Sequence, residues 1–393
     1  MRIKLNLIVL LLCLAGAVTV QALSTVEEDM KLVASDGVSS DGFGYASALS
    51  GDTLVIGAGG RSSYSGRAVY VFQRRESYWQ EQARLTASGS SASDFIGRTV
   101  AIDGNVIAAG SYNSDNFSGA VYIFRRQGSQ WLEQARLTAS DGSAGARFGS
   151  SIAIQDDILA VGAQGTYLGG DSGAVYIFQR VGTNWVETAK LTASDGAVGD
   201  LVGLSLALDG NTIVVGSVGA AYVFQRTNTG WIERAKLIPS DGENSCVFGL
   251  SVAIRKNIIV VGDYCNFQGF IFGAAYIYER SEMLWHEQSK IQASDLVGED
   301  SFGWSVAINE RADTVAIGAP LHSTDEVYIG AAYVFKRNGS TWVEQFKLVN
   351  SDGAYGDDFG VSIDINENLV VVGALNSDGN ETDSGAAYIF YTP

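Results

Sequence analysis

Few residues in this 393-residue chain have side chains suited to nucleophilic, acid–base or metal chemistry, apart from its carboxylates. There are 2 histidines, His286 and His322, and 3 cysteines, against 43 aspartates and glutamates. Two histidines argue against catalysis or metal binding that relies on several of them. The Gly-x-Ser-x-Gly motif of many serine hydrolases is also absent, which leaves carboxylates as the abundant candidates.

The aspartates recur at two positions along the chain. The first lies in the phrase Ser-Asp-Gly and its variants, at Asp36, Asp141, Asp195, Asp241, Asp295 and Asp352. The second lies two residues before a recurring Phe-Gly position, at Asp41, Asp94, Asp200, Asp300 and Asp357. Either these side chains satisfy turn backbones, or they form an acidic ring that binds a cation such as Ca²⁺ or a cationic ligand. Paired carboxylates also serve in glycosidases, but an active site is usually singular and these positions repeat.

A glutamate and an arginine recur with the same regularity. Glu81 lies two residues after Trp79, and Arg74 lies two residues after Phe72. Both have counterparts in other parts of the chain. We predict that the glutamate and the arginine pair across one hairpin, as a structural contact worth roughly 0–1 kcal/mol if it is exposed.

These spacings belong to a unit that is written seven times. The pair Phe-Gly begins at residues 43, 148, 248, 302 and 359, with degenerate copies at 96 and 202. The tyrosine of Gly-Ala-x-Tyr-x-Phe recurs at Tyr70, Tyr122, Tyr176, Tyr222, Tyr276, Tyr333 and Tyr388. A Trp-x-Glu-x-x-Lys/Arg phrase begins at Trp79, Trp131, Trp185, Trp231, Trp285 and Trp342. Three markers in phase indicate an internal repeat of about 53 residues.

Each unit contains four segments with strand character, which in the first unit are residues 43–49, 53–58, 68–74 and 79–87. Turn sequences such as Asp-Gly-Asn separate them. Seven four-stranded units favour an all-β, seven-bladed β-propeller, and the recurrent glycines suit close packing near its axis. A β-sandwich or an open solenoid is the alternative.

The ends of the chain provide a further prediction. The seventh unit stops after its third strand, at Phe390, and lacks the strand that begins with tryptophan. Residues 26–32 align with residues 79–85, with Val26 in place of Trp79. We therefore expect this N-terminal segment to complete the last blade and close the ring.

The succession of Phe-Gly, Val-Gly-Ala and Gly-Ala-x-Tyr-x-Phe resembles the FG-GAP repeats of the integrin α-chain head. The phrase Leu-Thr-Ala-Ser-Asp-Gly resembles secreted FG-GAP repeat proteins still more closely. The resemblance covers the chain after residue 22 and implies a seven-bladed propeller in extracellular recognition or adhesion. It does not extend to the calcium loops of several integrin blades. The corresponding turns here, at residues 50–52, 155–157 and 255–257, offer too few oxygens for a Ca²⁺ cage.

The loops before Gly-Ala-x-Tyr differ most between units, so we look for partner binding there. Unit four has almost no loop, at residues 216–219, whereas units five to seven have longer ones. Unit five contributes Tyr264, Phe267, Phe270 and Phe272, and unit six contributes His322 and Tyr328. Aromatic side chains in exposed loops often contact a protein or a glycan. The alternative is that they pack locally.

Two features of the loops depend on the compartment. Cys246 and Cys265 both fall in unit five and are predicted to form a disulfide, with a pair of reactive thiols as the alternative. Asn-x-Ser/Thr sequons at Asn116, Asn338 and Asn380 lie in predicted loops and are candidate N-glycosylation sites.

The first 22 residues have the pattern of a secretory signal peptide. Arg2 and Lys4 precede an apolar run over residues 5–20, and Val20-Gln21-Ala22 fits a cleavage site. The alternative, a membrane anchor, would need roughly 20 apolar residues. Residues 23–393 would then be the secreted propeller, with no membrane span. The formal charge of −17 argues against nucleic-acid binding, which needs basic surface.

We expect a secreted recognition or adhesion module that binds an extracellular protein or glycan through one loop-bearing face. No cofactor is expected, apart from the calcium alternative above. A secreted carbohydrate-active or other hydrolytic enzyme that uses the same face is the alternative function. The sequence favours binding because it contains no catalytic motif that we can identify.

Overall fold

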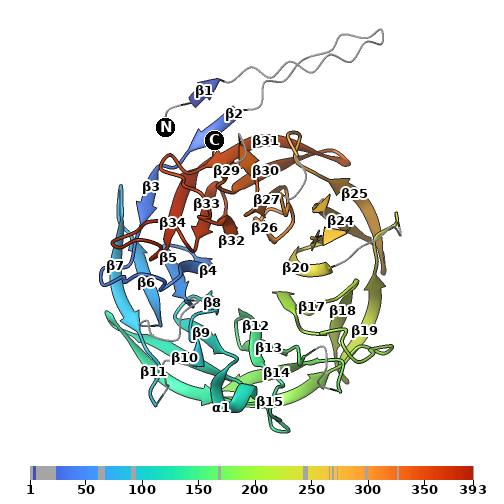
Figure 1. Cartoon of the computed structure of the whole chain (residues 1–393). Helices are drawn as coiled ribbons and strands as arrows, with labels where there is room; N and C mark the ends of the chain where they lie inside the picture. The colour runs from blue at the N-terminus through green and yellow to red at the C-terminus, as the bar shows by residue number, and fades with distance from the viewer. Residues whose placement is uncertain are drawn as a thin grey trace.

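A computed structural model describes residues 3–5, 24–60, 67–89, 94–166, 170–241, 247–264, 266–267, 270–271, 273–296, 300–324 and 327–392. Seven antiparallel sheets are arranged as blades around a central axis, with each blade's first strand innermost and its fourth strand at the rim (Figure 1). The predicted seven-bladed, all-β propeller is therefore confirmed.

The first four blades follow one another along the chain, each with four consecutive strands. Blade one has β4 (Phe43–Ser50), β5 (Thr53–Ala58), β6 (Ala68–Arg74) and β7 (Trp79–Leu85). Blade two has β8 (Thr99–Asp103), β9 (Val106–Ser111), β10 (Ala120–Gln127) and β11 (Gln130–Leu137), with helix α1 (Ser114–Phe117) in the loop after β9. Blade three has β12 (Phe148–Gln155), β13 (Ile158–Ala163), β14 (Ala174–Val181) and β15 (Asn184–Leu191). Blade four has β16 (Ser205–Asp209), β17 (Thr212–Ser217), β18 (Ala220–Thr227) and β19 (Gly230–Leu237).

The last three blades include short hairpins in their loops. Blade five has β20 (Phe248–Arg255), β21 (Ile258–Asp263), β24 (Ala274–Ser281) and β25 (Leu284–Ile291), with the hairpin β22 (Asn266–Phe267) and β23 (Phe270–Ile271). Blade six has β26 (Ser305–Ile308), β27 (Thr314–Ala319), β30 (Ala331–Asn338) and β31 (Thr341–Val349), with the hairpin β28 (Ser323–Thr324) and β29 (Val327–Tyr328). Blade seven has β32 (Phe359–Asn366), β33 (Leu369–Ala374) and β34 (Ala386–Tyr391), completed by β3 (Met30–Leu32).

The second and third strands of each blade form the core, because both of their faces pack against neighbouring sheets. Every residue of β5 is buried, as the continuous apolar run Thr-Leu-Val-Ile-Gly-Ala requires. In the five blades that have the Phe-Gly pair, its ring packs against the tyrosine and the second aromatic residue of the third strand, as Phe43 does against Tyr70 at 5.4 Å between ring centroids. In blade one Trp79 belongs to the same cluster of buried residues, so the three repeat markers meet in one core.

Glycine is required where neighbouring blades touch. Gly373 in blade seven lies against the backbone of Gly44 in blade one, and an added Cβ would lie 1.9 Å from the Gly44 carbonyl oxygen. Gly44 itself has a φ of +92°, a conformation that side chains other than glycine rarely adopt. Equivalent glycines occupy the other junctions, so the predicted role of glycine in close packing is confirmed.

The N-terminal segment closes the ring, but it divides between two blades. Strand β3 pairs antiparallel with β34, with Lys31 opposite Tyr388, and so completes blade seven as predicted. The preceding strand β2 (Ser24–Glu27) instead pairs parallel with β31 of blade six, with Val26 opposite Leu348. Strand β1 (Ile3–Leu5) lies beside β2. The expectation that all of residues 26–32 align along blade seven is therefore corrected to Met30–Leu32.

Candidate functional site

The two faces of the propeller carry different connections. We call the face formed by the loops between second and third strands and by the linkers between blades the loop face. The opposite face, formed by the turns between first and second and between third and fourth strands, is the turn face. The loops vary in length as predicted: in blade four β17 and β18 are separated by only Val218 and Gly219, whereas blades five and six insert hairpins.

Each linker on the loop face is fastened to the outer strand of the blade that follows it. In blade one, Ser35 donates hydrogen bonds to Glu81 from its backbone N–H at 2.9 Å and from its hydroxyl at 2.7 Å. We call this arrangement the serine–glutamate clip. It recurs at Ser88–Glu133, Ser140–Glu187, Ser194–Glu233, Ser240–Glu287, Ser294–Glu344 and Ser351–Glu28.

The predicted pairing of Glu81 with Arg74 is wrong. In the strand register Glu81 lies opposite Phe72, while Arg74 lies opposite Trp79. The guanidinium of Arg74 lies 5.2 Å from the ring centroid of Tyr391. The linker supplies two donors to the glutamate within 3 Å, so the carboxylate serves the connection between blades and not its own hairpin.

The aspartate of Ser-Asp-Gly makes a second fastening beside the clip. Asp141 accepts hydrogen bonds from the Tyr176 hydroxyl at 2.6 Å and from Lys190 Nζ at 2.6 Å. The bond from Lys190, followed by that from Tyr176, lowers the pKa of Asp141. The equivalent groups are Asp36 with Tyr70 and Arg84, Asp195 with Tyr222 and Lys236, Asp241 with Tyr276 and Lys290, Asp295 with Tyr333 and Lys347, and Asp352 with Tyr388 and Lys31.

Blade two makes the same kind of fastening with a carboxylate from a different loop. Its linker reads Ser88-Gly89 and has no aspartate after the serine. Asp115, from helix α1 in the loop after β9, pairs with Arg136 instead, and Arg136 also donates to the Tyr122 hydroxyl at 3.2 Å. A carboxylate supplied from a different loop thus restores the same tyrosine–cation–carboxylate group.

The six aspartates of the first position are therefore each paired with a lysine or an arginine. At the second aspartate position, Asp41, Asp200 and Asp357 accept the backbone N–H of the residue three positions earlier, at 2.8, 2.7 and 3.0 Å. These bonds fit the interpretation that the side chains satisfy turns. Among the residues that the structure describes, no group of three or more histidine, cysteine, aspartate or glutamate side chains is placed to hold a metal ion.

His322 is buried, with 3% of its surface exposed, so its prediction as a surface contact residue is corrected. Its Nδ1 lies 2.9 Å from Asp300 Oδ2, and its Nε2 lies 2.6 Å from Lys347 Nζ. Since lysine can only donate, Nε2 accepts and Nδ1–H donates to Asp300. The imidazole thus braces the blade-six loop against β31.

Two predicted aromatic residues, Tyr264 and Tyr328, each lie against an aromatic ring that sequence reasoning did not single out. Tyr328 and Tyr355 meet edge to face at 6.2 Å between centroids, and Tyr355 is 74% exposed. Tyr264 of blade five packs against Trp304 of blade six at 5.4 Å. The side chains of Phe267 and Phe270, and all of Phe272, lie outside the described residues.

The structure describes the three sequon asparagines but not the two cysteines. Cys246 and Cys265 lie outside the described residues, so the disulfide stays a prediction. Asn116, Asn338 and Asn380 are all exposed, as N-glycosylation requires. Asn380 Nδ2 donates to the carbonyl of Ala34 in the first linker.

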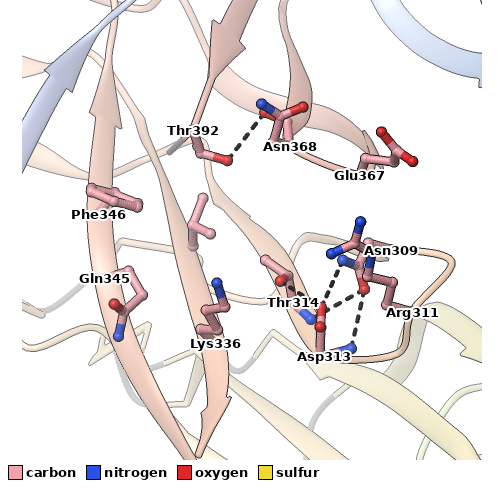
Figure 2. A pocket seen from close by; sticks show the side chains of 11 residues that line it. Asn309, Arg311, Asp313, Thr314, Lys336, Gln345, Phe346, Glu367, Asn368 and Thr392 are labelled. Atoms are coloured by element: carbon pink, nitrogen blue, oxygen red, sulfur yellow. Dashed lines mark hydrogen bonds between the residues drawn. The ribbon is translucent and has the colours of Figure 1, made fainter.

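A pocket of about 250 Å³ lies on the turn face between blades six and seven. Figure 2 shows Gln345 and Phe346 on one side, Thr392 and Asn368 on another, and the turn that carries Arg311 closing a third. Sequence reasoning missed this pocket, although the absent tryptophan of unit seven was a signal for it.

The ring of similar blades, each clipped to the linker before it, defines a closed β-propeller built from a single repeated unit. A profile of the FG-GAP repeat matches the chain seven times, at residues 26–72, 79–124, 131–178, 185–228, 231–278, 285–335 and 342–390. The chain therefore belongs to the FG-GAP repeat family. A comparison with curated proteins found no match. Within the described residues, no helix is both long and apolar enough to span a membrane.

Proposed function

We propose that this FG-GAP propeller is a secreted recognition or adhesion module, and that its loop face at blades five to seven binds an extracellular protein or glycan. The observation that carries the proposal is the Tyr328–Tyr355 pair, because Tyr355 is 74% exposed although its ring is apolar. Tyrosine offers a large rigid surface and a hydroxyl that stays solvated, which suits both protein and sugar contacts.

Other exposed apolar residues lie in linkers on the same face. Val198 lies at the linker position of Tyr355 and Val38 lies one position earlier, and they are 61% and 48% exposed. The same two linkers carry Asp36, paired with Arg84, and Asp195, paired with Lys236, so the face presents apolar and charged groups in the same linkers. Polar groups around an apolar centre are typical of protein interfaces. A hydrolytic function would need an accessible acid–base pair, and the His322–Asp300 pair is buried.

Binding is tested with residues 23–393 on protein and glycan arrays, comparing the wild type with Tyr355→Ala and Tyr78→Ala. Tyr78, in a turn of blade one, is an exposed tyrosine on the turn face and serves as the matched control. We expect Tyr355→Ala to lower the affinity for a captured ligand by at least about fivefold, the effect of a residue at the centre of an interface. Equal loss in both variants, or in neither, would count against the loop face.

A further inference from the structure

We propose that the pocket between blades six and seven binds a tryptophan side chain presented by another polypeptide. The inference concerns the turn face and so goes beyond the function proposed above. It follows from a comparison of blade seven with the other six blades, in which a tryptophan of the chain itself occupies the equivalent place.

In six blades the tryptophan at the start of the outer strand packs between its own blade and the preceding one. Trp131, for example, lies in a cluster that contains Val71 of blade one and Phe124 of blade two. The corresponding cluster between blades six and seven contains no tryptophan. Val26 enters it from β2 instead, and valine is much smaller than tryptophan.

Backbone contacts place the pocket at the tryptophan position of blade seven. In blade two Arg126 lies opposite Trp131, and its N–H donates to the Asn105 carbonyl at 2.9 Å. In blade seven the N–H of Thr392 donates to the Asn368 carbonyl at 2.8 Å. Thr392 is therefore the counterpart of Arg126, and both Thr392 and Asn368 line the pocket (Figure 2).

One inner wall of the pocket matches a tryptophan site, and the other has an aromatic ring where the compared blade has alanine. Val334 and Phe346 are the counterparts of Val71 and Ala83, which pack in the cluster of Trp131. Val334 is 2% exposed and forms the apolar floor. Phe346 is partly buried and offers an aromatic wall, so an inserted ring would contact apolar surface on two sides.

Gln345 supplies an acceptor for the indole N–H. It occupies the same place in the outer strand as Gln82 and Gln288, whose Oε1 atoms accept the indole N–H of Trp131 at 3.2 Å and of Trp342 at 2.9 Å. Gln345 donates through Nε2 to the carbonyl of Val343 at 3.1 Å. Its Oε1 accepts no hydrogen bond from the described residues.

A second departure from the repeat falls at the same junction. The turn between β26 and β27 runs from Asn309 to Thr314 and is two residues longer than the equivalent turn from Ser50 to Thr53. Asn309 Nδ2 donates to Asp313 Oδ1 at 2.8 Å and shapes this turn (Figure 2). Exposed Arg311 from this turn and exposed Lys336 from β30 both line the pocket. Cations bind favourably to the face of an indole ring.

None of the seven tryptophans in these 393 residues is left to fill the pocket. Six tryptophans begin the outer strands, and the seventh, Trp304, pairs with Tyr264 on the loop face. The pocket is smaller than the roughly 300–1,000 Å³ of sites for drug-sized ligands, and suits one side chain. The N–H of Tyr391 is already bonded to Asp29 Oδ2 at 2.7 Å, so a ring enters without a strand being added.

The test uses the acetylated, amidated peptide Ser-Thr-Trp-Val-Glu, the sequence of residues 340–344, carrying 5-fluorotryptophan and followed by ¹⁹F NMR. The variant Gln345→Leu removes the acceptor from the pocket. Gln288→Leu removes the same group where Trp342 already uses it, and is the matched control.

We expect saturable binding of the peptide that Gln345→Leu weakens roughly 2- to 10-fold, the effect of one hydrogen bond. Gln288→Leu should leave this affinity unchanged while lowering the stability of the fold. That result would separate the effect on peptide binding from an effect on folding. No binding at millimolar peptide, equal binding of a peptide with alanine for tryptophan, or no effect of Gln345→Leu would overturn the proposal. Free indole binding as tightly as the peptide would overturn the assignment to a polypeptide.

Discussion

At the residue scale, one clip of the seven differs from the rest. In blade six the Ser294 hydroxyl lies 3.4 Å from Glu344 Oε1, whereas the corresponding distance is 2.7 Å in the clip of Ser140 and Glu187. The carboxyl of Glu344 lies close to the buried groups around Asp295, and burial raises its pKa to about 7. The carboxyl of Glu344 therefore loses its proton near neutral pH in the folded state.

The free energy of unfolding should fall as the pH rises through this range. Between the ordinary glutamate value of 4.5 and about 7, the folded state keeps a proton on Glu344 that the unfolded state releases. The folded state binds more protons, so raising the pH favours unfolding. Glu344→Gln should reduce this decline, as measured by urea unfolding at pH 5 and pH 8.

Glu187→Gln removes a carboxylate from an equivalent clip and is the control for that measurement. The slope is the change in the free energy of unfolding between pH 5 and pH 8. The effect of Glu344 is the change in this slope in Glu344→Gln beyond the change in Glu187→Gln. Identical slopes in the wild type and Glu344→Gln would show that this carboxyl does not titrate between pH 5 and 8.

At the scale of the element, six of the seven innermost strands are hydrogen-bonded to the next blade through one side chain. Ser251 in β20 donates to the carbonyl of Gly303 in blade six at 2.8 Å, and the same bond recurs from Thr99, Ser151, Ser205, Ser305 and Ser362. Blade one has Ala46 at this register position, opposite Gly57. The junction between blades one and two therefore lacks a bond that the other six have.

Replacing Ala46 with serine should stabilise the propeller. The Gly97 carbonyl lies against Gly57 as the Gly303 carbonyl lies against Gly262, so the new hydroxyl has an acceptor in place. We expect a gain of about 0.5–1.5 kcal/mol, the net worth of one hydrogen bond, measured by chemical denaturation. The reverse change, Ser251→Ala, should cost a similar amount, and a loss of stability in Ala46→Ser would contradict the equivalence of the junctions.

At the scale of the whole molecule, the ring is held shut by few contacts. Strand β3 has three residues, whereas the outer strand of blade two has eight. The clip of Glu28 with Ser351 and the pairing of Lys31 with Asp352 add to this short ladder. Gly373 against Gly44, and the bond from the N–H of Leu49 to Asp364 at 2.7 Å, close the inner side.

The clip at the closure should matter more than the same clip elsewhere. Glu28→Ala removes the clip that holds the segment before β3. We expect the free energy of unfolding to fall by about 1–3 kcal/mol, as for hydrogen bonds to a charged group. Proteolysis near residues 24–32 should become faster. Glu133→Ala, in the middle of β11, should cost less and leave that segment protected. Chemical denaturation and limited proteolysis measure the two effects, and equal effects would show that closure is no weaker than the other junctions.

The sequence predicted the parts of this fold that depend on local pattern. Apolar runs and turn residues placed residues 53–58 and 68–74 at the observed strands, and the repeat count determined the number of blades. Contacts between elements were less predictable. The partner of Glu81 comes from a linker 46 residues away, and His322 is buried because a loop folds over β31. The division of residues 24–32 between two blades likewise depends on which sheet edge is open, and periodicity does not reveal this.

The joining of Glu28 to Ser351 across 323 residues affects how the protein is made. At translation rates of roughly 5–20 residues per second, the earliest part of the nascent chain waits about 15–65 s for its partner. During that time blade one has no neighbour on one side, and its apolar flank is available to other nascent chains. Efficient folding therefore depends on chaperones that cover this apolar flank until the C-terminal residues have been synthesised.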